Sequence, residues 1–448
     1  MTIRSIALLA LACAAAGCGR SIVSPAPDGL TLEARRSSTP IQHVVYIIQE
    51  NRSFNNMFMG FPGATTAKFG FNTKGKKIKL KALPLSTAWD VGHASPAYFA
   101  ACDGQGSVPG TDCKMDGWLN EVAGQGAPAN PEYSYVPENQ IEPYWAMAKQ
   151  YVLADNVFAS NLDGSFVAHQ YVVAGYSSGA VDFPDGDWGC EGGKPDTVRT
   201  ITMQRKYGSS IQACFNNPTI ASEADSAGIS WRFYTGAIGA DGGLWSSYQA
   251  DSPIYHSPDW NADVINPPSQ FLTDIGNGNL AAVTWITPIF EASDHPGMEA
   301  SQGPAWVASV VDAIGKSKFW GSTAIFLQWD DWGGMFDPVK PIYEDYDGLG
   351  FRVPLIVISP YAKKASVTHV QYETASVLRF IEDDFGLPQL AVSDVRANDP
   401  ANDPAALDYG QPPRKFKKIG GSKPVSYWIE LEHRSRMRGK PANMIGDD

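Results

Sequence analysis

The pattern of apolar and polar positions is dominated by short runs of consecutive apolar residues that each end in a polar stretch. The clearest run, HVVYII, spans His43 to Ile48, and a second run spans Thr323 to Trp329. Runs of this kind are typical of strands that are covered on both faces, as in a parallel sheet. We therefore predict two central strands at these positions.

Other segments have the spacing of helices or of further buried strands. Apolar positions recur at helical intervals in 142–151 and 306–314, and helices are also predicted over 166–176 and 372–385. The runs LAAVTWITP and PLIVISP read as additional strands. At 448 residues the chain could hold two or three average domains, but α/β enzymes often use such a length for one elaborated core.

Candidate metal ligands follow the two central strands. Glu50 and Asn51 come directly after the first, and Asp330 and Asp331 directly after the second. In open α/β sheets, ligands bind just beyond the carboxyl ends of the strands. An isolated Asp-Asp pair is more typical of a solvated turn, but two neighbouring carboxylates repel each other, and a cation would compensate that cost. The repeat of the pattern at two strand ends favours a metal site.

A candidate nucleophile stands at the start of a predicted helix. The turn Asp163-Gly164-Ser165 precedes the helix expected over 166–176. Free N–H groups and the helix dipole favour anions at such a position. A serine before a helix is more often a simple cap, so this position alone does not establish catalysis.

The segment IQHVVYIIQENRSFNNMF resembles the opening signature of the bacterial phosphoesterase family that contains phospholipases C and certain acid phosphatases. The likeness continues, in the family's order over roughly residues 41 to 390, through the blocks KMDGW, PYWAMAKQYVLADNVFAS, DHPG, QWDDWGGMFDPV, DGLGFRVPLIVISPYAK and HVQYETASVLRFIEDDFGLP. The resemblance implies an alkaline phosphatase-like fold, that is, a doubly wound three-layer α/β sandwich with a mostly parallel central sheet and long loop insertions. It also implies a hydrolase that acts on phosphoric ester bonds.

The resemblance assigns roles to individual residues. It places the family's Thr or Ser nucleophile at Ser165, and it places histidines that approach the phosphate or the metal at His93 and His295. For His93, a loop histidine that only forms hydrogen bonds is an equally good interpretation. His169, one turn after Ser165, departs from the phospholipase pattern and its role stays open.

The predicted metal site is rich in oxygen ligands, and its four members are Glu50, Asn51, Asp330 and Asp331. Such ligands suit a divalent ion such as Ca, Mg or Mn, although Zn also accepts carboxylates. Phospholipases of the family commonly have Asp-Glu-His-Gly-Gly where this chain has Asp330-Asp331-Trp332-Gly-Gly. Both departures resemble the acid phosphatase branch.

These features predict a metal-dependent phosphoesterase that hydrolyses phosphate esters through a phosphoserine intermediate. The substrate would be a phosphate monoester, as for an acid phosphatase, or a phosphodiester lipid, as for a phospholipase C. The departures at 331 and 332 favour the acid phosphatase. A catalytically silent, metal-binding surface lipoprotein is the alternative from another class. The absence of GxSxG argues against an α/β-hydrolase esterase, and the net charge of -12 argues against a nucleic acid partner.

The N-terminus reads as an export signal of the lipoprotein type, residues 1–18, with an apolar run before Gly17-Cys18. Cleavage there would give a periplasmic or extracellular protein, which a lipid on Cys18 could anchor to a membrane. Residues 19–40 would be a flexible tether, 41–392 the catalytic domain with insertions near 62–130 and 180–275, and 393–448 a tail that wraps the surface.

Four cysteines remain beyond the signal, and an even count in an exported protein suggests disulfides. Three pairings are possible. Proximity in the sequence favours Cys102–Cys113 and Cys190–Cys214. Zinc binding is less favoured, because none of the four cysteines makes a CxxC pair.

Overall fold

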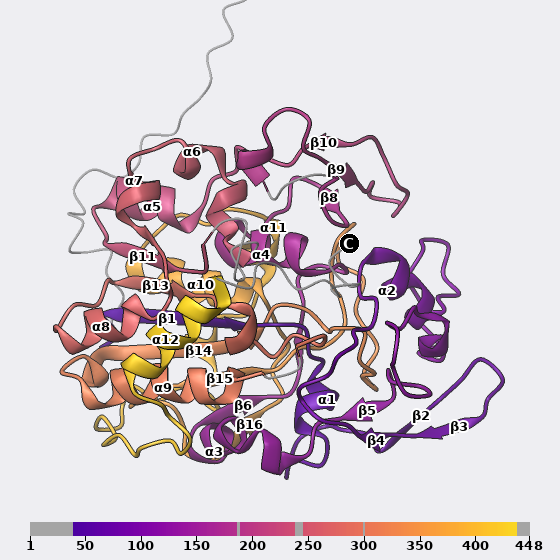
Figure 1. The fold of residues 1–448 in the computed structure, drawn as a ribbon, viewed down its shortest axis with the longest axis horizontal. Helices are drawn as coiled ribbons and strands as arrows, with labels where there is room; N and C mark the ends of the chain where they lie inside the picture. The colour runs from indigo at the N-terminus through magenta and orange to yellow at the C-terminus, as the bar shows by residue number, and fades with distance from the viewer. Residues whose placement is uncertain (1–38, 186–188, 238–244, 299–300, 437–448) are drawn as a thin grey trace, which may run out of the picture. The chain divides into compact units, whose positions relative to one another are not determined.

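The computed structural model describes residues 39–185, 189–237, 245–298 and 301–436, and its centre is an eight-stranded sheet (Figure 1). The predicted signal 1–18 lies outside these residues, as does the tether 19–40 apart from its last two residues. In spatial order, the strands are β12 (Val264–Ile265), β11 (Trp231–Tyr234), β13 (Val283–Ile286), β1 (His43–Gln49), β14 (Thr323–Trp329), β15 (Leu355–Ile358), β6 (Val152–Ala154) and β16 (Ser366–Thr368).

Strand direction is nearly uniform across this sheet. β1 is parallel to both of its neighbours, β13 and β14, and β11 is parallel to β12 and β13. Of the eight strands described here, β15 alone runs against its neighbours β14 and β6, and β16 is again parallel to β6. The prediction of a mostly parallel sheet is therefore confirmed.

Helices cover both faces of the sheet (Figure 1), as the burial of the strands requires. All seven residues of β14 are buried, so side chains on both of its faces are covered. One group of neighbouring helices comprises α3 (Glu142–Gln150), α8 (Gln270–Gly276) and α9 (Gly303–Lys316). The other comprises α4 (Ser165–Ala174), α5 (Ile220–Ala227) and α10 (Ala375–Phe385). This is the doubly wound α/β sandwich that the resemblance implies.

The two regions predicted as insertions contain small sheets of their own. In the first, β2 (Phe69–Phe71) and β3 (Lys77–Lys79) form a hairpin, β4 (Lys81–Ala82) pairs with β5 (Ser134–Tyr135), and α2 (Ser95–Cys102) follows the predicted loop histidine. In the second, β8 (Ala180–Val181), β9 (Thr197–Thr200) and β10 (Ile211–Gln212) form an antiparallel sheet.

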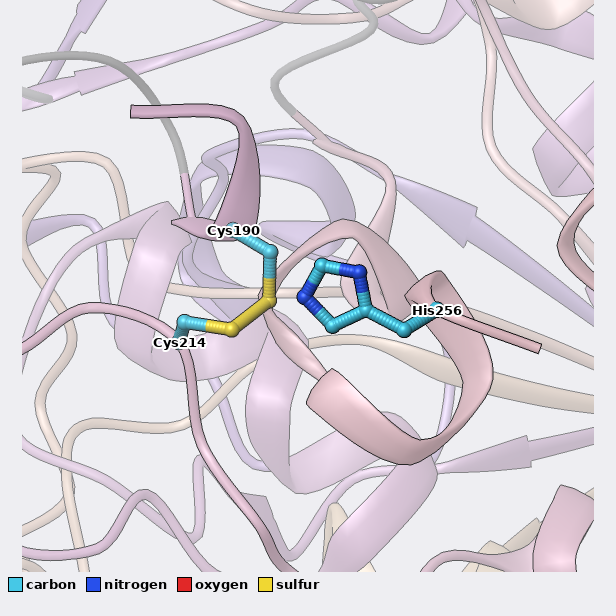
Figure 2. A group of neighbouring side chains, drawn as sticks. All are labelled: Cys190, Cys214 and His256. Atoms are coloured by element: carbon cyan, nitrogen blue, oxygen red, sulfur yellow. A yellow bond between two sulfur atoms is a disulfide. The ribbon is translucent and has the colours of Figure 1, made fainter. Parts of the chain in front are cut away.

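Two disulfides close loops inside these insertions. Cys102 is bonded to Cys113 and Cys190 to Cys214, which confirms the pairing favoured by proximity. The imidazole of His256 lies beside the second disulfide (Figure 2). Because both sulfur atoms are bonded to each other, neither is a thiolate that could bind a metal with His256.

The C-terminal segment contributes two helices, α11 (Val392–Arg396) and α12 (Val425–Arg436). Trp428 of α12 is buried and packs edge-on against Trp306 of α9, with ring centroids 5.1 Å apart. The helix predicted over 372–385 begins only at Ala375, because Tyr372–Glu373 pairs as strand β17 with β7 (Val157–Phe158). Among the described residues, none of the helices has the length and apolarity needed to cross a membrane.

The loops that follow β1 and β14 lie directly against each other. The parallel register pairs Gln49 with Trp329, so Glu50 and Asp330 are the next residues after the two strands. The backbone N–H of Arg52 donates to the carbonyl oxygen of Asp331 at 3.0 Å. Gly333 has φ +58°, and a Cβ atom there would lie 2.0 Å from the carbonyl oxygen of Asn51. Only glycine fits this crossing.

We expect Gly333→Ala to lower the free energy of unfolding by more than about 1 kcal/mol, because alanine is strained at this φ and its methyl group collides with backbone. Thermal unfolding followed by circular dichroism measures the effect. Gly321→Ala is the matched control, since a Cβ atom at Gly321 meets nothing within 4 Å. Equal stability of the two variants would contradict this account of the crossing.

Candidate active site

Three carboxylates meet at the edge of the sheet where β1 and β14 end. The side chains of Glu50, Asp330 and Asp331 are at most 1% exposed. Asn51 lies among them with φ +57°, a left-handed conformation that asparagine tolerates better than most residues. Its backbone N–H donates to Oδ1 of Asp330 at 2.9 Å. The four predicted ligands are therefore brought together by two loops that are far apart in the sequence.

Ser165 is the first residue of α4, and its hydroxyl faces this cluster. Its Oγ lies 3.4 Å from Oε2 of Glu50, 3.3 Å from Oδ1 of Asn51 and 3.5 Å from Oδ2 of Asp331. The helix is held on the sheet by the indole N–H of Trp285, which donates to the carbonyl oxygen of Val172 at 3.0 Å. Ser165 therefore occupies both the helix N-terminus and the carboxylate cluster.

Asp163 fixes the turn that presents Ser165. Its Oδ1 accepts hydrogen bonds from the N–H groups of Gly164 at 2.8 Å and Ser95 at 3.1 Å, and its Oδ2 accepts from the N–H of Asp182 at 2.6 Å. Burial and the nearby charge of Asp182 raise the pKa of Asp163 well above its ordinary value. One carboxyl group thereby joins the turn before α4 to the loop that carries His93.

His93, in the first insertion, and His295, in the loop after β13, meet at the side-chain amide of Asn51. The Nδ1 atom of His93 is 2.8 Å from the carbonyl oxygen of Val91, and Nδ1 of His295 contacts the carbonyl oxygen of Pro296. In a neutral imidazole ring, a carbonyl oxygen next to Nδ1 places the proton on Nδ1 and leaves Nε2 as an acceptor. The amide nitrogen of Asn51 is 2.7 Å from Nε2 of His93 and can donate to it.

The two possible orientations of the Asn51 side-chain amide imply different charges on the neighbouring histidines and a different repulsion with the carboxylates. With its nitrogen toward the two histidines, which lie 2.7 and 3.0 Å away, its oxygen faces Oε2 of Glu50 and Oδ1 of Asp330, each 3.2 Å away. Acceptor oxygens that face one another repel unless a cation or a donor lies between them, and the Ser165 hydroxyl can donate to only one of them. The opposite orientation would relieve this repulsion, but it would require both imidazoles to be doubly protonated, because each Nδ1 already faces a carbonyl group.

His169 is a candidate metal ligand that sequence reasoning left without a role. Its Nε2 lies 3.2 Å from Oε1 of Glu50 and 3.8 Å from Oδ2 of Asp330, and all three side chains are buried. The sequence held a signal for it: Ser165 and His169 are four residues apart in one helix and so lie on the same face.

The residues present fit a divalent metal ion. Glu50, His169 and Asp330 offer one ligand atom each, close enough together to hold one ion, and carboxylates with imidazole are accepted by Zn and Mn. Within the described part of the chain, Oδ2 of Asp330 is buried and accepts no hydrogen bond. Uncompensated burial of a carboxylate oxygen is costly, and a bound cation would remove that cost.

Asp294, next to His295, anchors the third loop of the site. Its Oδ2 accepts hydrogen bonds from the hydroxyl of Tyr144 at 2.7 Å and the indole N–H of Trp329 at 3.0 Å. Burial raises the pKa of Asp294 to about 6, against the opposing effects of Tyr144 and of the Arg52 guanidinium. Arg52 itself is turned away from the cluster and donates from Nε to the carbonyl oxygen of Asp294 at 2.8 Å.

Trp332 does not contribute to the cluster. Its indole is fully buried and packs against Trp118 and Phe351, with ring centroids 5.6 and 4.8 Å away. The residue that departs from the phospholipase pattern is therefore part of a hydrophobic core in the first insertion.

A small cavity of about 10 Å³ lies beside Ser165. Phe166 and Phe183 supply apolar walls, and Asp163 and Asp182 supply acidic ones. The space beside the Ser165 hydroxyl is therefore about the size of one water molecule.

Comparisons with known proteins establish the family of this chain. The family model described as Phosphoesterase family matches residues 41–388. Phospholipase C B of Mycobacterium tuberculosis is 26% identical over 410 residues, which cover 78% of this chain and 74% of that protein. Hemolytic phospholipase C of Pseudomonas aeruginosa is 24% identical over 413 residues, 79% of this chain and 54% of that protein.

Among solved structures, a protein of the alkaline phosphatase superfamily from Vibrio parahaemolyticus aligns over 80% of this chain and 71% of its own, at 11% identity and a TM-score of 0.35. A likeness at that score carries no argument by itself, whereas the family match covers the strands, the loops and the histidines described above. The chain belongs to the phosphoesterase family and is a hydrolase that acts on phosphoric ester bonds.

Proposed function

We propose that this protein hydrolyses phosphate esters in two steps, with a phosphoserine at Ser165 as the intermediate. The observation that carries the proposal is the position of the Ser165 hydroxyl, within 3.5 Å of Glu50, Asn51 and Asp331 and at the N-terminus of α4. Backbone N–H groups at a helix N-terminus favour a bound phosphate group. The same residue can therefore attack phosphorus and have its phosphoryl product stabilised.

Glu50, His169 and Asp330, together with the amide oxygen of Asn51, would hold a divalent ion. The bound ion would lower the pKa of the Ser165 hydroxyl and balance charge on the phosphoryl oxygens. Asp331 lies 3.5 Å from Ser165 Oγ, and its other carboxylate oxygen accepts the N–H of Gly333 at 2.7 Å, so its carboxylate is held in place next to the nucleophile.

His93 and His295 complete the proposed machinery. Both rings present Nε2 toward the Asn51 amide and are fixed through Nδ1 by backbone carbonyl groups. We assign them to the phosphoryl group, where Nε2 of one of them would take the proton that Ser165 loses and deliver it to the leaving oxygen as the ester bond breaks. Water would then attack phosphorus and break its bond to Ser165 Oγ, and one proton of the water would pass to Oγ, so that phosphate leaves and the serine hydroxyl is restored.

The proposed substrate is a phosphate monoester, as for an acid phosphatase. This choice rests on the sequence Asp330-Asp331-Trp332 and on the packing of Trp332 away from the site. A phosphodiester lipid is the second candidate, and it is favoured by the names of the relatives, which are phospholipases C. Both substrates present a phosphoryl group to the same residues.

We also propose that the chain is exported, through residues 1–18, to the periplasm or the exterior. A lipid on Cys18 would then anchor it, with residues 19–40 as the tether and 41–392 as the catalytic domain. The two disulfides support a destination outside the reducing cytoplasm.

Ser165→Ala is expected to lower the rate of p-nitrophenyl phosphate hydrolysis by about 10³-fold or more, because it removes the attacking oxygen. Acid quenching during turnover should leave a phosphoryl group on the peptide that contains Ser165, detectable by mass spectrometry. Ser177→Ala is the control, since this buried serine bonds Asp347 and does not face the cluster. Near-normal turnover by Ser165→Ala would exclude the proposed intermediate.

Dialysis against a chelator should abolish hydrolysis, and a divalent ion should restore it. His169→Ala should weaken metal binding, measured by calorimetry, by at least about tenfold, as expected for loss of a group in the metal environment. His369→Ala is the matched control, because its exposed ring bonds Asp155 outside the cluster. Unchanged metal affinity in His169→Ala would remove His169 from the ligand set.

The substrate class is tested by comparing p-nitrophenyl phosphate with p-nitrophenyl phosphorylcholine. We expect faster, Ser165-dependent release from the monoester. Preference for the phosphorylcholine diester would assign the protein to the phospholipase C activity instead. Release from neither compound, with metal bound, would favour the metal-binding surface lipoprotein.

A further inference from the structure

The hairpin formed by β2 and β3 differs in charge from the rest of the protein. The stretch 68–81 contains six lysines and no acidic residue, although the whole chain has a net charge of -12. All six lysines are exposed. The same hairpin displays two aromatic side chains, with Phe69 37% and Phe71 47% exposed. Basic and aromatic groups are thus combined on one small element.

The strand register separates the hairpin into an inner and an outer face. Gly70 pairs with Ile78, and a Cβ atom at Gly70 would lie 2.6 Å from the rings of Phe336 and Tyr133. Ile78 packs against the same hydrophobic core. The inner face is therefore seated closely on the body of the protein, and this contact fixes which side chains point outward.

The outer face carries Phe69 and Phe71 on one strand, opposite Lys79 and Lys77 on the other. The Nζ atom of Lys77 lies 3.6 Å from the centre of the Phe69 ring, and the two phenylalanine rings pack edge to face at 5.7 Å. Two apolar rings with ammonium groups beside them form one continuous amphipathic surface. Such a surface is complementary to a partner that has an apolar layer directly beneath a layer of negative charge.

The end of the hairpin is braced. The Oδ1 atom of Asn72 accepts the N–H groups of Lys74 at 3.1 Å and Lys76 at 3.0 Å, and the N–H of Gly75 donates to the carbonyl oxygen of Asn72 at 2.7 Å. Two further exposed lysines are thereby held at the turn. The basic surface is a formed structure, so little ordering entropy would oppose binding.

We propose that the outer face of the β2–β3 hairpin binds the surface of an anionic lipid bilayer. The phenylalanine rings would enter the interface between head groups and acyl chains, and the lysines would contact anionic head groups. The charge of the hairpin is complementary to such a surface, whereas the net charge of the whole chain opposes it. The contact would therefore be made through this element.

The hairpin is also joined to the active site. Phe336, on which Gly70 packs, follows Asp331 by five residues in the loop after β14. In Figure 1 the hairpin extends from the side of the molecule where α1 (Phe54–Phe58), the helix after β1, also lies. A bilayer bound there would lie on the side of the sheet where β1 leads into the site. The proposal does not depend on the substrate or on turnover.

Co-sedimentation with vesicles tests it. The full chain is used with Ser165→Ala, so that no lipid is cleaved, and with Cys18→Ser, so that no acyl anchor can form. We expect binding to vesicles of phosphatidylcholine mixed with phosphatidylglycerol, weak binding to phosphatidylcholine alone, and loss of binding as salt screens the charges. Lys77→Glu with Lys79→Glu should weaken the anionic binding by on the order of tenfold or more. Phe69→Ser with Phe71→Ser should weaken it severalfold.

Lys417→Glu with Lys418→Glu is the matched control, because it makes the same charge change at exposed positions in another basic stretch. Circular dichroism establishes that each variant is folded. The proposal is overturned if the hairpin lysine pair changes binding no more than the control pair does. It is also overturned if loss of both phenylalanines has no effect, since the hairpin would then bind polyanions such as heparin without using an apolar layer.

Discussion

The rest of the structure depends on the electrostatic cost of keeping Glu50, Asp330 and Asp331 together and buried. Two like charges about 4 Å apart repel by about 4 kcal/mol at an effective dielectric constant of about 20. The amide of Asn51 adds a further oxygen to this group when its nitrogen faces His93 and His295. Without a cation, keeping these atoms together would cost electrostatic free energy and would contribute nothing to packing. This cost supports the proposed role of the cluster as a metal site whose ligands are held in place before the ion binds.

That arrangement is held by groups outside the proposed ligand set. Gly333 allows the loop after β14 to cross the backbone of Asn51, and Asp163 joins the turn before α4 to the loop of His93. Backbone carbonyl groups set the tautomers of the two histidines. Because an error of about 1 Å in such a site is costly for catalysis, these supports matter as much as the ligands.

Negative and positive side chains are concentrated in different parts of the molecule. Acidic groups are buried at the end of β1 and β14, whereas the lysines of the β2–β3 hairpin are exposed. Phe336 packs under the hairpin and belongs to the loop that also carries Asp331. The proposed contact with a membrane and the proposed chemistry would thus share one loop, although each can be tested without the other.

The sequence by itself determined the central strands, the disulfide partners favoured by proximity and seven candidate site residues that the structure brings together, because these follow from apolar runs, spacing and the resemblance to a family. Tertiary structure decided what depends on distant contacts. His169 joins Glu50 and Asp330 only because α4 packs over the ends of β1 and β14. The close approach of Gly333 to the carbonyl group of Asn51 likewise depends on the tertiary structure. The packing of Gly70 against Phe336 and Tyr133 decides which face of the hairpin points outward. Local patterns do not contain such pairings, since the chain segments involved are separated by up to nearly three hundred residues.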